Sequence, residues 1–233
     1  MKHLLLPILI AALPVASPLR AQSAGQPAVV ELYTSQGCSS CPPADALLEK
    51  LAGRPGVIAL ALHVDYWDYI GWKDTFGDPA FAERQRDYAR AAGEKMIYTP
   101  QMIINGEEMI VGSDSAALAG ALAPVGGPGA PVLHLSQDGG TLSVRAEAVP
   151  GLAAPVMVEL VRYLPRATVG IDRGENAGRT ITYVNTVTSW REIGRWDGQG
   201  PLELTVETSG AQPAVVLIQE DGPGRILSAA RTK

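Results

Sequence analysis

Two cysteines carry the clearest chemical potential in this sequence. Cys38 and Cys41 are the only cysteines among 233 residues, and they form a Cys-x-x-Cys pair between an apolar segment and a run with helical spacing. The thiolate is the reactive form of cysteine, and a helix N-terminus favours it through free amides and partial positive charge. The pattern therefore predicts that Cys38 attacks a partner disulfide and that Cys41 resolves the mixed disulfide. A metal half-site, a static disulfide and two unreactive thiols fit the same pattern.

An acidic residue, Glu31, lies inside the apolar segment that leads to the cysteines. A carboxylate buried there without a function would be costly, whereas one close to Cys41 could accept the proton of that thiol. The alternative is an exposed glutamate on a half-solvated strand. Glu31 is therefore a candidate proton acceptor with a purely structural alternative.

A proline later in the chain, Pro100, opens the predicted strand 101–104. If the Thr99–Pro100 bond is cis, the backbone at Thr99 can approach the cysteine pair and hydrogen-bond an extended partner chain. From sequence alone only about 5–6% of X–Pro bonds are cis. Thr99 and Pro100 are therefore candidate partner-binding residues.

Aromatic residues and one histidine follow the second predicted strand. Tyr66 and Trp67 could form an amphipathic wall beside Cys38 that holds a peptide, or could pack an insertion against its own core or a second domain. His63 could join Cys38 and Cys41 as a ligand for Cu(I) or Zn, because soft sulfur ligands select these ions. It could equally be an ordinary histidine at the end of a strand.

A polar, glycine-containing loop spans residues 172–179. It could reach over the cysteine pair or contact a partner. Loops of this composition are more often simply solvated turns, so both interpretations stay open.

The order of predicted elements indicates a mixed α/β unit in residues 27–122. Strand, helix, strand, helix, hairpin and helix succeed one another, with an aromatic-rich insertion at about 66–80. The predicted elements lie at 28–34, 44–51, 57–64, 79–92, 101–104, 109–111 and 114–122. Asn105-Gly106 between two apolar runs predicts the hairpin turn.

The second half of the chain changes its pattern. Residues 123–131 are rich in proline and glycine and are predicted to be a linker. Beyond them an alternating pattern predicts an all-β, sandwich-like domain at 132–233, with no helix.

The first 21 residues predict a signal peptide, with Lys2 and His3 before an apolar run and a plausible cleavage site after Ala21. The apolar run is short for a membrane span, which needs about 20 residues, so we expect export to the periplasm or secretion without a membrane span after cleavage. A net charge of −5 gives no support for nucleic-acid binding.

Residues 28–122 resemble a domain of the thioredoxin superfamily. The stretches 31–43, 63–68 and 98–102 are more specifically similar to a secreted bacterial thioredoxin-like family of unassigned function, in which an all-β domain follows. The resemblance implies a cis Pro100, Cys38 as the nucleophile and Glu31 as the buried strand acid. The loop from Glu31 to Cys38 is one residue longer than in thioredoxin itself.

Together these features predict an exported thiol–disulfide oxidoreductase that exchanges disulfides with protein partners and needs no tightly bound cofactor. One alternative is a copper(I)-binding and delivery protein that uses Cys38, Cys41 and His63. The other is a non-enzymatic, thioredoxin-like adaptor in which Cys38 and Cys41 form a structural disulfide.

Overall fold

A computed structural model of the chain describes residues 26–127, 129–153 and 155–232. The predicted signal peptide, residues 1–21, lies outside the described residues. The N-terminal half forms these elements: β1 Ala28–Thr34, α1 Pro42–Ala52, β2 Val57–His63, the short helix η1 Asp68–Ile70, α2 Pro79–Ala91, β3 Gln101–Ile104, β4 Glu108–Val111 and α3 Ser115–Ala121. The C-terminal half forms these strands: β5 His134–Asp138, β6 Thr141–Ala146, β7 Val156–Gly170, β8 Thr180–Trp196, β9 Leu202–Glu207, β10 Ala214–Gln219 and β11 Ile226–Arg231.

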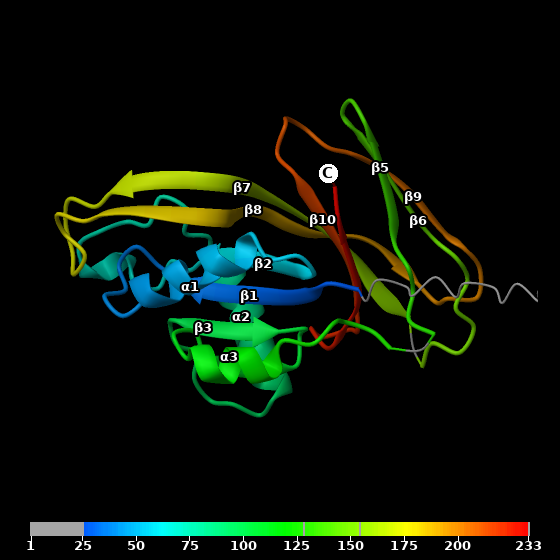
Figure 1. Cartoon of the computed structure of the whole chain (residues 1–233), viewed down its shortest axis with the longest axis horizontal. Coiled ribbons are helices and arrows are strands. Elements are labelled where there is room, and N and C mark those ends of the chain that lie inside the picture. The colour runs from blue at the N-terminus through cyan, green and yellow to red at the C-terminus, as the bar shows by residue number, and fades with distance from the viewer. Residues whose placement is uncertain (1–25, 128, 154, 233) are drawn as a thin grey trace, which may run out of the picture.

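The strands form one large mixed sheet and one smaller antiparallel sheet (Figure 1). The large sheet has eight strands in the order β11-β10-β7-β8-β2-β1-β3-β4, and the small sheet has the order β5-β6-β9. Strands β1 and β2 are parallel, with Thr34 beside His63 at their carboxyl ends, and β3 pairs antiparallel with β1. The carboxyl ends of β1 and β2 thus reach the same edge, next to the start of α1.

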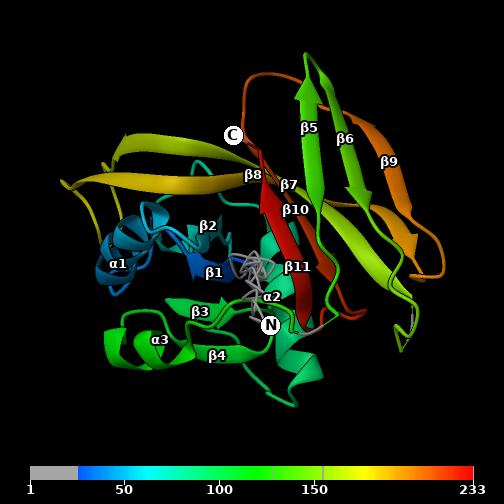
Figure 2. The same ribbon diagram turned by 45° about the vertical axis from the view of Figure 1, so that its right-hand side comes forward.

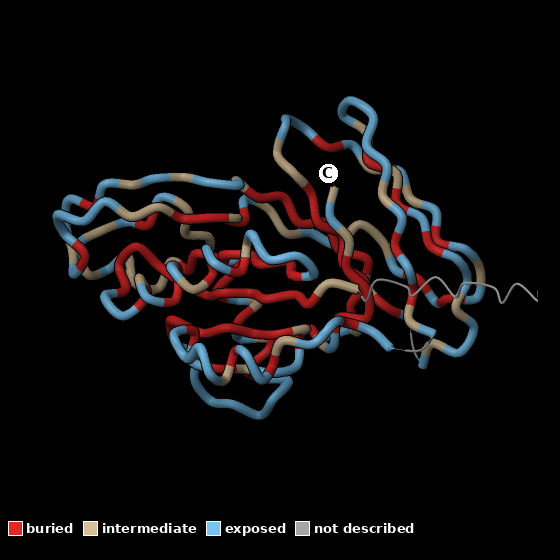
Figure 3. Tube along the Cα trace, in the orientation of Figure 1, coloured by how far each residue is buried: buried red, intermediate tan, exposed pale blue. Residues whose placement is uncertain are grey.

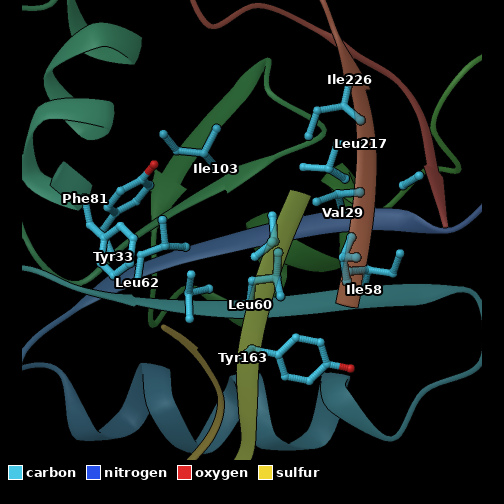
Figure 4. Close-up of a cluster of buried hydrophobic side chains, with 14 of the residues drawn as sticks. Val29, Tyr33, Ile58, Leu60, Leu62, Phe81, Ile103, Tyr163, Leu217 and Ile226 are labelled. Atoms are coloured by element: carbon cyan, nitrogen blue, oxygen red, sulfur yellow. The ribbon is translucent and has the colours of Figure 1, made fainter. Parts of the chain in front are cut away.

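Side chains of β1 alternate between two faces of the sheet, as the two-residue period of a strand requires. Val30 and Leu32 belong to the apolar cluster that includes residues of α1 and α3. Val29 and Tyr33 belong to the cluster that includes residues of α2 (Figure 4). Helices α1 and α3 therefore cover one face of the sheet, and α2 covers the other.

The small sheet packs on the second half of the large one. An apolar cluster joins Leu142 and Val144 of β6 to Val158 of β7 and to Val216 of β10. Strand β10 is buried on both sides, because its alternate residues, among them Leu217, enter the cluster that includes α2. Figure 3 shows that the buried residues are concentrated in the middle of the molecule.

The long hairpin of β7 and β8 joins the two halves of the chain (Figure 2). Strand β8 pairs with β7 along its length and also pairs in parallel with β2, where Ala61 is opposite Thr186. Strands from the predicted N-terminal and C-terminal domains therefore share one sheet and one apolar cluster. The sequence pattern did not predict this shared sheet.

Local signals account for the element boundaries. Asn105 and Gly106, at the β3–β4 turn, both have positive φ values, 54° and 75°, which a tight hairpin turn of this kind requires. Asp78 caps α2 by accepting a hydrogen bond from the backbone N–H of Ala80, and Pro79 occupies the first turn. Among the described residues, no helix is long and apolar enough to cross a membrane.

Candidate functional site

Cys38 and Cys41 form a disulfide at the start of α1, with their Cα atoms 5.4 Å apart. Cys41 is the N-cap residue of α1, and prolines occupy the first two helical positions. Cys38 lies three residues earlier, in the loop before the helix. Its sulfur lies 3.4 Å from the hydroxyl of Ser40, and only 2% of Cys38 and 0% of Cys41 is exposed. The pair is therefore at a helix N-terminus but almost completely covered.

The Thr99–Pro100 bond is cis, and the Trp67 side chain contacts Thr99. The indole Nε1–H of Trp67 donates a 2.7 Å hydrogen bond to the Thr99 hydroxyl. The Cβ of Trp67 also lies against Gly37, where an added Cβ would come within 3.1 Å of it. Trp67 thus connects Thr99 to the loop that carries Cys38, whereas Tyr66 points toward α2 and hydrogen-bonds Gln85 at 3.2 Å.

The loop before Cys38 is fixed by the aromatic segment through Gln36. The backbone N–H of Gln36 donates to Asp74 Oδ2 at 2.7 Å, and its side-chain oxygen accepts from Trp72 Nε1 at 2.8 Å. Its side-chain nitrogen donates to the hydroxyl of Thr75. Much of the aromatic segment therefore serves to hold the backbone next to the cysteines.

The loop at 172–179 reaches the cysteine pair, one of the two possibilities that the sequence left open. Asn176, which is 1% exposed, donates from Nδ2 to the backbone carbonyls of Gln36 and Cys38, both at 2.9 Å. Gly174 in the same loop packs against Trp72. The tip of the β7–β8 hairpin therefore covers the loop that carries Cys38 and adds a residue from the C-terminal half to the site.

Glu31 is buried, but its side chain lies on the wrong face to meet Cys41. It falls between Val30 and Leu32, which face α1, so strand alternation turns it toward α2. There its carboxylate accepts hydrogen bonds from Arg84 Nε at 2.9 Å, Arg84 Nη2 at 3.0 Å and the Tyr88 hydroxyl at 2.7 Å. The interpretation of Glu31 as the proton acceptor for Cys41 is corrected by this placement.

A different set of buried polar side chains lies on the α1 face, at the carboxyl ends of β1 and β2. The hydroxyl of Thr34 donates to Asp45 Oδ1 at 2.9 Å. His63 donates from Nδ1 to Asp74 Oδ2 at 2.8 Å, and its ring packs edge-on against Tyr183 of β8, with centroids 4.7 Å apart. We call Thr34, Asp45, His63, Asp74 and Tyr183 the Asp45 cluster.

The sequence analysis did not predict this cluster, although the alternation of side chains along the strands could have indicated part of it. Thr34 and His63 occupy positions that face α1 in neighbouring parallel strands, and Asp45 follows Cys41 by one helical turn. Asp45 by itself resembles an ordinary acidic residue in the first turn of a helix. Tyr183 comes from a strand more than 100 residues away in sequence, so only the fold brings it here.

Burial and charge shift the pKa values in the Asp45 cluster. Burial raises the pKa of Asp45 to about 6, although His63 and the Thr34 hydroxyl oppose the rise. Burial alone would also raise the pKa of Asp74, but His63 and the backbone N–H of Gln36 hold it below its ordinary value. Burial, with the charges of Asp45 and Asp74, raises the pKa of Tyr183. A buried carboxyl group with a raised pKa therefore lies one helical turn after Cys41.

A comparison with protein families identifies the family of this chain. Residues 29–219 match the family described as protein of unknown function (DUF1223). The chain belongs to this family. This DUF1223 protein is also similar to a protein from Agrobacterium tumefaciens whose crystal structure is known. That likeness has 29% sequence identity and a TM-score of 0.71, and it covers 88% of this chain and 92% of the other.

A second solved structure, HBP35 of Porphyromonas gingivalis, has a TM-score of 0.59 over 89% of this chain and 75% of that one. At 13% identity, that likeness concerns the fold alone. No curated protein matches the sequence of this DUF1223 protein.

His63 of this DUF1223 protein is engaged with Asp74, and both thiols form the disulfide. Within the described ranges, no group of three or more His, Cys, Asp or Glu side chains is placed to hold a metal ion. Cys38, Cys41 and His63 are therefore not brought together as a ligand set. The geometry instead combines a disulfide and a buried carboxyl group, that of Asp45, at the start of one helix.

Proposed function

We propose that this protein is an exported thiol–disulfide oxidoreductase whose N-terminal half is a thioredoxin-like unit. One observation carries the proposal: Cys38 and Cys41 form a disulfide at the N-terminus of α1. The hydrogen bond from Trp67 to Thr99, which links Thr99 to the loop that carries Cys38, also supports it. Export rests on the sequence of residues 1–21.

In the reducing direction the reaction has two steps. The Cys38 thiolate attacks a partner disulfide, which forms a Cys38–partner bond and releases one partner thiolate. The Cys41 thiolate then attacks Cys38, which restores the intramolecular disulfide and releases the second partner thiolate. The partner gains two electrons and the protein loses two, and both partner thiolates take protons from their surroundings. The oxidising direction is the reverse.

The surfaces around Cys38 suit a protein partner. Ser39 and Ser40 are exposed, and Tyr69 is 80% exposed while its ring stacks near Trp67, with centroids 6.4 Å apart. An aromatic surface next to a helix start can hold an extended chain by apolar contact, and the Thr99 backbone can hydrogen-bond it. We therefore expect protein thiols and disulfides as substrates.

A structural disulfide in a non-enzymatic adaptor is the second candidate, and the burial of the sulfur atoms favours it. Only 2% of Cys38 is exposed, and the side chain of Asn176 donates a hydrogen bond to the Cys38 carbonyl. A working exchange protein must therefore open the β7–β8 tip or shift the Cys38 loop when a partner binds. This requirement separates the two candidates by experiment.

The test uses the Cys41→Ser variant in cells that export the protein. We expect Cys38 of this variant to accumulate as mixed disulfides with other proteins, because the resolving thiol is missing. The adducts should disappear on reduction, and the Cys38→Ser variant is the matched control that should form none. If the Cys41→Ser protein is folded and exported yet forms no adducts, the oxidoreductase proposal fails and the structural disulfide gains support.

A further inference from the structure

Three buried polar atoms of the Asp45 cluster lack a hydrogen-bond partner among the described residues. They are Asp45 Oδ2, His63 Nε2 and the hydroxyl of Tyr183. Buried polar atoms in native proteins are nearly always paired, and unpaired ones tend to mark sites with a function. These three come from α1, β2 and β8, and all three side chains are buried. Three unpaired polar atoms in one cluster, which includes a residue one helical turn after Cys41, suggest a role in the chemistry of the cysteines.

Asp45 is placed to exchange a proton with Cys41. Asp45 lies in α1 four positions after Cys41, the N-cap residue, and the backbone N–H of Asp45 donates to the Cys41 carbonyl at 3.1 Å. Side chains at positions i and i+4 lie on the same face of a helix, one above the other. Cys41 is completely buried and Asp45 is 7% exposed, so bulk water has little access to either.

The partners of Asp45 leave one of its oxygen atoms available. Thr34 donates to Oδ1, and Oδ2 has no partner in the described part of the chain. Asp74 accepts from His63 Nδ1, which fixes the imidazole ring so that Nε2 points away from Asp74. The His63 ring is held further by edge-on contacts with Phe76 and Tyr183.

We infer that Asp45 accepts the proton of Cys41 during resolution, and that His63, oriented by Asp74, is the positioning residue that favours the ionised carboxylate. This inference rests on the proposed function. The Cys41 S–H bond breaks and its proton moves to Asp45 Oδ2, directly or through a water molecule. The Cys41 thiolate then attacks Cys38, a new Cys38–Cys41 bond forms, and the partner leaves with the electron pair of the broken mixed disulfide.

The charges around Asp45 set the pH range in which it can act. It faces His63 from β2, Asp74 from the loop after η1, Tyr183 from β8 and Cys41 from its own helix, while Thr34 of β1 is uncharged. Burial raises the pKa of Asp45 to about 6, against the opposing effect of His63. Asp45 is therefore largely ionised, and ready to accept a proton, above about pH 6.

The experiment separates the two thiol reactions in time. The fully reduced protein is mixed with one equivalent of the aromatic disulfide DTNB, and the coloured thiolate is followed by stopped flow. Cys38 releases the first equivalent, and Cys41 releases the second when it resolves the mixed disulfide. In the wild-type protein we expect the second rate to fall as the pH drops through about 6.

Asp45→Asn should slow the second phase by about 100-fold near neutral pH, within the range of general-base catalysis, and leave the first phase unchanged. The variant's second rate should then rise with pH and show no inflection near 6. Asp45→Glu should restore part of the rate. His63→Gln should move the inflection to higher pH, because the group that favours the carboxylate is missing.

Glu31→Gln is the control for loss of a buried carboxylate, and it should leave the pH profile of the second phase unchanged. An unaltered second phase in Asp45→Asn would overturn the inference, as would an equal slowing of both phases. Because DTNB reports on any reactive dithiol, this assay can succeed or fail independently of whether the Cys41→Ser variant traps protein partners.

Discussion

Glu31 in β1 and Asp45 in α1 both carry buried carboxyl groups, yet the surroundings of the two groups differ. Glu31 faces α2, and each of its oxygens accepts hydrogen bonds from Arg84 or from a tyrosine. Asp45 faces β1 and β2 from α1, accepts one hydrogen bond from the Thr34 hydroxyl, and keeps Oδ2 without a partner among the described residues. A buried carboxylate whose two oxygens are both hydrogen-bonded has a structural role. A buried carboxylate with an unpaired oxygen can still accept a proton there.

The Glu31 network also joins the halves of the chain. Arg84 donates to Glu31 from the first half and to Gln219 of β10 from the second, both within 3.0 Å. Its guanidinium lies over the ring of Trp190 of β8, 3.7 Å from the centroid, and approaches Glu159 of β7 at 3.4 Å. One arginine therefore connects α2 to four strands, and this arrangement explains why a glutamate is tolerated in the apolar strand β1.

The largest expected effect comes from removing Arg84. Arg84→Ala leaves Glu31 buried without its cation, and breaking a buried ion pair costs about 3–5 kcal/mol of unfolding free energy. Denaturant unfolding measures the change. Arg86→Ala, two residues along the same helix, removes an exposed pair with Glu83 and should cost below about 1 kcal/mol. If both variants lost the same unfolding free energy, the buried pair of Arg84 with Glu31 would be no more stabilising than an exposed pair, and Glu31 would lose its structural role.

A pH-dependent gain in stability is expected when Asp45 is replaced. The folded-state pKa is about 6 and the ordinary value is 3.8, so between these values the folded protein binds more protons than the unfolded chain. The contribution of Asp45 to stability is therefore greatest below about pH 4 and is lost as the pH rises through 6, by up to about 3 kcal/mol. Asp45→Asn should remove this dependence.

The measurement is the difference in unfolding free energy between Asp45→Asn and the wild-type protein, both with the disulfide intact, at pH 4.5 and at pH 7.5 (about 25 °C). The variant should gain relative stability at the higher pH. A constant difference across this range would show that Asp45 titrates normally.

A smaller effect is expected at the hairpin tip. Asn176→Ala removes the two hydrogen bonds to the carbonyls of Gln36 and Cys38, and it should cost about 1–3 kcal/mol. Because the tip covers the Cys38 loop, a thiol reagent should also modify reduced Cys38 faster in the variant. Asn185→Ala, which removes a hydrogen bond from the same hairpin to the Ala59 carbonyl, is the control that should not raise the reactivity of Cys38.

The smallest effect is expected at the exposed pair between Arg166 of β7 and Glu49 of α1, which are 2.7 Å apart. More than 40% of each side chain is exposed, so water and salt screen the interaction. Arg166→Ala should change the unfolding free energy by less than about 1 kcal/mol and should leave both DTNB phases unaltered. A large loss would show that charge pairs stabilise this protein regardless of burial.

The local elements of the fold follow from the sequence. The apolar runs at 28–34 and 57–64 form β1 and β2, Asn105-Gly106 makes the β3–β4 turn, and Asp114 caps α3 through its side chain. The strand-to-helix position of the cysteines is also local. These features depend on neighbours within a few residues, where periodicity, caps and turn chemistry act directly.

The remaining features depend on contacts between distant segments. The pairing of β2 with β8 brings Ala61 beside Thr186, and no periodic pattern encodes that meeting. Glu31 was assigned to the cysteines because its strand leads to them, but the one-residue difference in loop length matters. A shift of one residue moves a side chain to the other face of a sheet. Asn176 and Tyr183 enter the site only through the β7–β8 hairpin.

If Cys38 and Cys41 exchange electrons with protein partners, as proposed, their reduction potential must lie in the range of exchange proteins. The protein is equilibrated in a graded redox buffer, its thiols are trapped, and the reduced fraction is measured by mass spectrometry. We predict a potential between about −270 and −120 mV, the range of working exchange proteins. A value well below about −300 mV would mark a structural disulfide and rule out the proposed exchange activity.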